Sequence, residues 1–168
     1  MLAGTGKTVL TSMVIDHVQS LLQASPNPEG FAFFYCSRNG NDQKRRESLS
    51  VLQSYVRQLS ADIWKPGNML KSLRDRRREM MKRGSNHLSF EARKELLLES
   101  MKLYTKTALV LDALDECEKD SHRELVEVIE DLLSKSERPL KVFISSRPDG
   151  DIRELFNSWP KHQKSSHR

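Results

Sequence analysis

The run Gly4-Thr5-Gly6-Lys7-Thr8, followed at once by apolar residues, constrains this chain more than any other stretch. It matches the second half of the pattern G-x-x-x-x-G-K-[ST], in which a glycine-rich loop leads into the first turn of a helix. Small residues let backbone N–H groups curl around phosphate oxygens, and the helix N-terminus adds partial positive charge. The pattern predicts that Lys7 reaches the outer phosphates of a nucleotide and that the Thr8 hydroxyl holds Mg²⁺. The predicted nucleotide-binding residues are Gly4, Thr5, Gly6, Lys7, Thr8 and Val9.

The front of this loop is incomplete. The first glycine of the pattern would stand five residues before Gly6, where the chain has Met1, and the strand that normally enters the loop is absent. We therefore expect a truncated product or a partial gene model.

Apolar periodicity predicts alternating helices and strands along the chain. Helices are expected near residues 7–23, 46–60 and 89–104, from Ser121 past residue 132, and over 151–157. Ser89 is a predicted N-cap, and Ser121 with Glu124 forms a capping-box pattern. Apolar runs at 31–36, 107–111 and 140–146 predict buried strands. This alternation favours an α/β fold in three layers, a parallel sheet with helices on both faces.

Polar side chains follow two of the predicted strands, at the edge where open parallel sheets bind ligands. Asp112 comes directly after four apolar residues, in the place of a Mg²⁺-holding carboxylate. Asp115 and Glu116 lie just beyond it, and either one could orient or deprotonate an attacking water. Arg147 follows the third strand and could contact a γ-phosphate. We therefore predict Thr8 and Asp112 as metal ligands, and Asp115, Glu116 and Arg147 as catalytic residues.

Composition narrows the possible partners. The net charge of +5 comes largely from the basic stretch at residues 71–83, which we interpret as a solvated helix face or a connection. Because no aromatic residues interleave with it, nucleic-acid binding is a third and weaker hypothesis. No segment approaches the ~20 apolar residues that cross a membrane.

The two cysteines, Cys36 and Cys117, are too few for a disulfide framework and suggest a reducing compartment. Neither they nor His17 have partners at metal-ligand spacing, so we interpret all three as packing or surface residues. We expect a cytoplasmic protein.

Taken together, these residues resemble the nucleotide-binding domain of the NACHT class of STAND NTPases, which are P-loop NTPases. The fungal form, also described as nephrocystin-3-like N-terminal domains, is the most similar. The resemblance covers residues 2–160 and rests on five segments: Gly4–Leu10, Phe33–Cys36, Val56–Leu59, Leu109–Cys117 and Phe143–Pro148. The domain expected is thus a partial nucleotide-binding domain over 1–160, with a disordered polar tail over 161–168.

The resemblance implies binding of ATP or GTP with Mg²⁺ and slow hydrolysis used as a switch. By this resemblance, Asp112 would bind Mg²⁺, Asp115 or Glu116 would activate water, and Arg147 would sense the γ-phosphate. Protein partners are implied through self-assembly or through related NACHT proteins. The family sheet, in order 5-1-4-3-2, would here lack its first and fifth strands, which leaves the strand carrying Phe143 with an unpaired edge. The alternative function is that of a truncated, non-catalytic interaction fragment that no longer binds nucleotide.

Overall fold

The computed structural model describes residues 5–37, 48–60, 73, 75, 78–79, 89–148 and 150–157. Gly4, the tail over 161–168 and most of the basic stretch lie outside these residues, as do the side chains of Thr5, Lys7 and Thr8. Within the basic stretch, Arg78 pairs with Asp75 at 3.6 Å on the surface.

Three parallel strands form the sheet, as the sequence predicts. They are β1 (Gly30–Tyr35), β2 (Thr107–Asp112) and β3 (Leu140–Ile144), in the spatial order β1-β2-β3. The register pairs Tyr35 with Asp112 and Leu111 with Ile144, so all three strands end at the same edge. Among the described strands β3 pairs with β2 alone, which agrees with the unpaired edge expected for the strand of Phe143.

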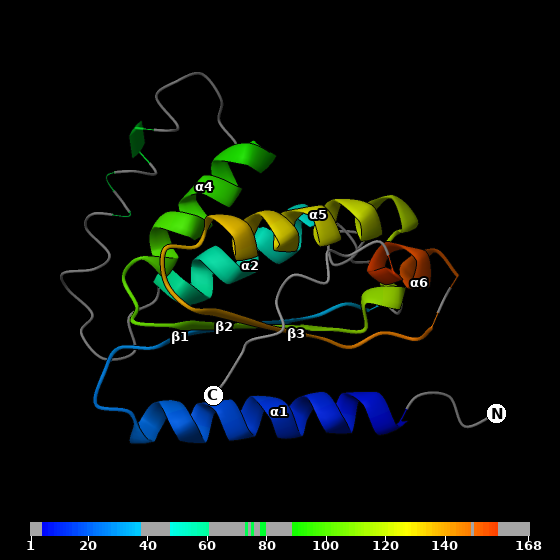
Figure 1. Cartoon of the computed structure of the whole chain (residues 1–168), viewed down its shortest axis with the longest axis horizontal. Helices are drawn as coiled ribbons and strands as arrows, with labels where there is room; N and C mark the ends of the chain where they lie inside the picture. The colour runs from blue at the N-terminus through cyan, green and yellow to red at the C-terminus, as the bar shows by residue number, and fades with distance from the viewer. Residues whose placement is uncertain are drawn as a thin grey trace.

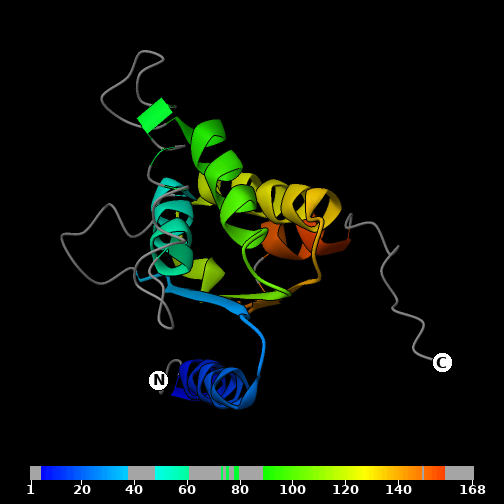
Figure 2. The same ribbon diagram turned by 90° about the vertical axis from the view of Figure 1, so that its left-hand side faces the viewer.

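Helices cover both faces of this sheet (Figure 1). α1 (Thr5–Ala24) lies on one face, where it contacts β2 and β1. On the other face lie α2 (Ser48–Ser60), α4 (Phe90–Met101) and α5 (Lys119–Lys135), and α6 (Gly150–Asn157) packs against α5. Figure 2, turned by 90°, shows α1 on the opposite side of the sheet from the other described helices. The predicted α/β class with a helix-flanked parallel sheet is confirmed, and it is consistent with an incomplete P-loop-like fold.

The main core fills the space between the sheet and the helices opposite α1. Alternate strand residues Ala32, Leu109 and Leu111 point into it, as period-two side-chain alternation requires. Tyr55 of α2 is buried there, and its hydroxyl donates to the carbonyl of Val110 at 3.0 Å. Burial raises the pKa of Tyr55 because a phenolate has no solvent to stabilise it there. The predicted inward residues of α5 are buried too: Leu125, Val128, Ile129 and Leu132.

One of the two predicted helix starts is confirmed and the other is wrong. The Ser89 side chain caps α4 by accepting from the amide of Ala92 at 3.2 Å. α5 begins at Lys119 rather than at Ser121, and its N-cap residue Glu118 makes no side-chain cap bond. The reason is that Ser121 already donates its amide to the carbonyl of Glu118, so it lies inside the first turn.

In the described part of the chain, no helix combines the length and the apolar character that crossing a membrane requires.

Candidate functional site

The candidate site lies where β2 and β3 end and where the first turns of α1 pass over the sheet. α1 runs antiparallel to the strands, so its N-terminal end lies at their carboxyl edge (Figure 1). Thr11 of α1 contacts Asp112, the last residue of β2, although they are 101 residues apart in sequence. The predicted phosphate loop and the predicted metal-binding carboxylate are therefore brought to the same edge of the sheet.

Asp112 is buried and is held by two hydroxyl groups. Its Oδ1 accepts a hydrogen bond from Thr11 Oγ1 at 2.5 Å and another from Ser145 Oγ. Only 2% of Asp112 is exposed, and Thr11 and Ser145 are buried as well. A buried carboxylate without such donors would carry a large desolvation cost, so the hydroxyls help to keep this one in place.

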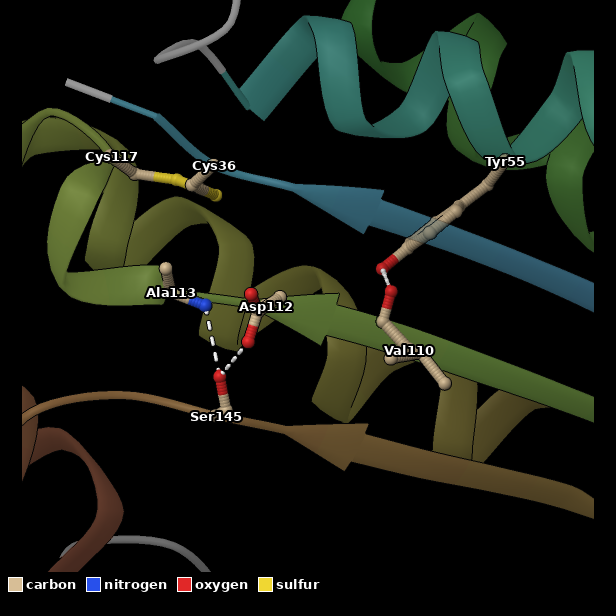
Figure 3. Close-up of a disulfide and its surroundings, with 7 residues drawn as sticks. All are labelled: Cys36, Tyr55, Val110, Asp112, Ala113, Cys117 and Ser145. Atoms are coloured by element: carbon tan, nitrogen blue, oxygen red, sulfur yellow. Dashed lines mark hydrogen bonds between the residues drawn. A yellow bond between two sulfur atoms is a disulfide. The ribbon is translucent and has the colours of Figure 1, made fainter. Parts of the chain in front are cut away.

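The chain leaves β2 through a tight turn that needs a left-handed residue. Ala113 has φ 56°, a conformation that non-glycine residues adopt infrequently and at some cost. Its amide donates to Ser145 Oγ at 3.0 Å, and its carbonyl accepts from the amide of Glu116. Figure 3 shows the Ala113 amide and Asp112 converging on the Ser145 hydroxyl. The short 3-10 helix η2 (Leu114–Glu116) follows, and it carries both predicted acids.

Asp115 and Arg147 are brought together across the two strand ends. The Arg147 amide donates to Asp115 Oδ1 at 2.8 Å, and Arg147 Nε lies 3.5 Å from Asp115 Oδ2. The Asp115 side chain is only 4% exposed, whereas half of the Arg147 side chain reaches solvent. Arg147 is therefore anchored to Asp115 through its amide and its Nε, while part of its side chain remains in contact with solvent. Glu116 is half-buried, next to this pair in the chain.

The expectation that Cys36 and Cys117 take part in no disulfide is wrong. They form a disulfide with their Cα atoms 5.7 Å apart, although they are separated by 81 residues (Figure 3). Parallel pairing of β1 with β2 causes this, because Cys36 follows Tyr35 and donates its amide to the carbonyl of Asp112. The turn after β2 then brings Cys117 back to the same place. His17 lies exposed on α1, as a surface residue should.

The carboxylate group of Asp112 is a type of ligand that Mg²⁺ prefers. Magnesium is usually bound through one or two carboxylates together with substrate phosphates, not by a full protein cage. The described residues contain no group of three or more His, Cys, Asp or Glu that could hold a metal. A single carboxylate and a threonine beside a nucleotide need no such group, so the residues fit Mg²⁺ only as part of a nucleotide site.

The sequence predictions missed two residues of this site, Thr11 and Ser145. Thr11 is a polar residue on the face of α1 that turns to the sheet, and this polarity was the signal in the sequence that could have marked it as a site residue. Ser145 lies in the quoted Phe143–Pro148 segment but was assigned no role.

A family model described as nephrocystin 3, N-terminal, matches residues 2–147 of the chain. No curated protein matches the chain. The matched range includes the predicted phosphate-loop residues, the three described strands and each of the other predicted site residues.

Proposed function

This chain belongs to the nephrocystin 3 N-terminal family, and on that premise we propose that it is a nucleotide-binding module of the NACHT type that takes ATP or GTP together with Mg²⁺. The observation that carries the proposal is the contact between Thr11 and the buried Asp112 carboxylate. Thr8 precedes Thr11 by three residues, and residues three apart are neighbours on a helix surface. A phosphate at the start of α1 would therefore lie close to a carboxylate able to share its metal ion.

The start of α1 supports the proposal in two further ways. Its first turn contains no acidic residue, so nothing there repels an anion from the helix N-terminus. Gly6 lies within the helix, exposed, and a Cβ at that position would meet no described atom within 4 Å. Gly6 is the second residue of α1, and no contact with a described atom explains why this position lacks a side chain. A ligand that approaches the backbone closely would explain it.

In the proposed module, Thr8 and Asp112 hold Mg²⁺ and Lys7 contacts the outer phosphates. The metal would neutralise phosphate charge. The tip of Arg147 supplies positive charge to the γ-phosphate, as its partial exposure permits. We assign activation of the attacking water to Glu116 rather than Asp115, because both oxygens of Asp115 face Arg147. Slow hydrolysis would then act as a switch that governs assembly with other NACHT chains.

The test is a titration of the purified chain with fluorescent ATP and GTP analogues, with and without Mg²⁺, alongside Lys7→Ala. Loss of the charged contact from Lys7 should weaken binding about tenfold to a hundredfold. Lys141→Ala, which removes an exposed lysine from β3, is the matched control and should bind like the parent chain. A folded chain that shows no saturable binding of either nucleotide would contradict the proposal and favour the non-catalytic interaction fragment.

A further inference from the structure

We propose that Thr11 and Ser145 are positioning residues that fix one oxygen of Asp112 and thereby reserve the other for Mg²⁺. This inference deepens the proposed function and rests on it. Neither hydroxyl would touch the metal or the nucleotide in this arrangement. Their part is to set the orientation of the carboxylate before a ligand arrives.

The two hydroxyls use up the acceptor capacity of one carboxylate oxygen. Oδ1 of Asp112 accepts from Thr11 and from Ser145, and an ionised carboxylate oxygen has about two lone-pair sites. Thr11 has no exposed surface at all, and Ser145 is only 9% exposed, so water does not compete with these bonds. Within the described part of the chain, Oδ2 accepts no hydrogen bond. Oδ2 is thus the oxygen left for a cation.

The direction of the Ser145 bond follows from its other contacts. The amide of Ala113 donates to Ser145 Oγ at 3.0 Å, so this oxygen is already an acceptor there. A serine hydroxyl has one proton, and that proton is left for Asp112. The backbone of Ser145 is also fixed at both ends, because its amide donates to Leu111 and its carbonyl accepts from Leu114. Ser145 therefore cannot turn away without breaking the junction between β2 and β3 (Figure 3).

Three separate elements consequently determine the carboxylate plane. Thr11 comes from α1, Asp112 from β2 and Ser145 from the end of β3. Rotation of the Asp112 carboxylate would break both hydroxyl bonds at once. Groups that orient a metal ligand without touching the metal typically change metal affinity 10- to 100-fold when removed, and we expect about that effect here.

The variants that test this are Thr11→Val, Thr11→Ser and Ser145→Ala. Valine keeps the shape of threonine and removes the hydroxyl, whereas serine keeps the hydroxyl. Thr107→Val is the matched control, because Thr107 is a buried threonine on β2 whose Oγ1 has no hydrogen-bond partner among the described residues. Circular dichroism and thermal melting establish that each variant is folded.

The measurement is the Mg²⁺ concentration at half-maximal enhancement of binding of a fluorescent ATP analogue to the full chain, with Mg²⁺-free binding measured in EDTA. In Thr11→Val and Ser145→Ala we expect this midpoint to rise about tenfold or more, while binding in EDTA stays unchanged. Thr11→Ser should restore the midpoint, and Thr107→Val should match the parent chain. A role in structure alone would change binding in EDTA as well.

The other outcomes contradict either the positioning role alone or the proposed function as well. If folded Thr11→Val keeps the parent midpoint, or loses binding in EDTA to the same degree, the positioning role is wrong and nucleotide binding stands. If Thr11→Val does not fold, Ser145→Ala decides the matter by the same readout. If the parent chain binds no nucleotide under either condition, both this inference and the proposed function fail, and the parent titration alone reveals it.

Discussion

Asp115, one of the predicted catalytic residues, also makes a structural contact. Its carboxylate accepts from the Arg147 amide and faces the Arg147 side chain, while it is almost completely buried. The pair closes the gap between the exits of β2 and β3. The Asp115 carboxylate should therefore contribute to the stability of the fold.

Replacement of Asp115 by alanine should destabilise the chain. It leaves the Arg147 amide without its acceptor, and loss of a hydrogen bond to a charged group costs about 1.5–3 kcal/mol. Urea unfolding of Asp115→Ala measures this cost. Glu118→Ala removes an exposed acid with no side-chain cap bond and should change stability by less than about 0.5 kcal/mol. Equal stability of the two variants would show that Asp115 anchors nothing.

The pair formed by His122 and Asp151 predicts a pH effect. His122 Nδ1 lies 2.9 Å from Asp151 Oδ2, and this hydrogen bond is the main cause that lowers the pKa of Asp151. An aspartate whose pKa is lowered by folding stabilises the folded state above its unfolded pKa of about 3.9. That contribution disappears as the pH falls through the lower folded value.

We therefore expect the parent chain to exceed Asp151→Asn in stability near pH 5, with the difference shrinking toward pH 3. The difference should stay below about 1 kcal/mol, because the Asp151 side chain is 40% exposed and solvent screens the pair. Unfolding curves across this pH range test it. Glu154→Gln, an exposed acid on the same helix, serves as control. A difference that does not change with pH would contradict the assignment.

At the scale of elements, α1 differs from the other helices because apolar side chains occupy both of its faces. Ile15 and Thr11 turn to the sheet and are buried. On the opposite side Val9, Leu10, Met13 and Leu21 are each more than half exposed. Residues on that side contribute little to the stability of this chain by itself, because they exclude little water from apolar surface.

The two faces of α1 should therefore respond differently to substitution. Ile15→Ala removes buried volume and should cost about 2–4 kcal/mol. Met13→Gln alters a side chain that is 63% exposed and should change stability by less than about 0.5 kcal/mol. Thermal and urea unfolding of both variants compares the faces directly. A large loss in Met13→Gln would mean that this face packs against something in the folded chain.

At the scale of the whole molecule, the disulfide between Cys36 and Cys117 joins two distant parts of the chain. It closes a loop of 81 residues, which includes α2, α4 and β2. Cross-links that close loops of this length stabilise proteins mainly by restricting the unfolded chain.

Reduction should accordingly lower the free energy of unfolding by about 2–4 kcal/mol. Urea unfolding with and without dithiothreitol measures the loss, and the double variant Cys36→Ser, Cys117→Ser should not respond to the reductant. Alkylation of the denatured chain without reductant provides an independent readout. Labelling of both thiols in that experiment would show that the bond is absent in solution.

Local patterns in the sequence determined much of this protein. Apolar periodicity predicted the individual strands and the inward residues of α5, residue type predicted the Ser89 cap, and the alternation of strands with helices predicted a parallel sheet. The same patterns located Asp112, Asp115 and Arg147 at strand ends. Only the tertiary structure decided which distant groups meet: Cys36 with Cys117, Asp115 with Arg147, and Thr11 with Asp112. These contacts depend on strand register and on the rotation of α1 over the sheet, which packing of the whole chain sets and no short segment encodes.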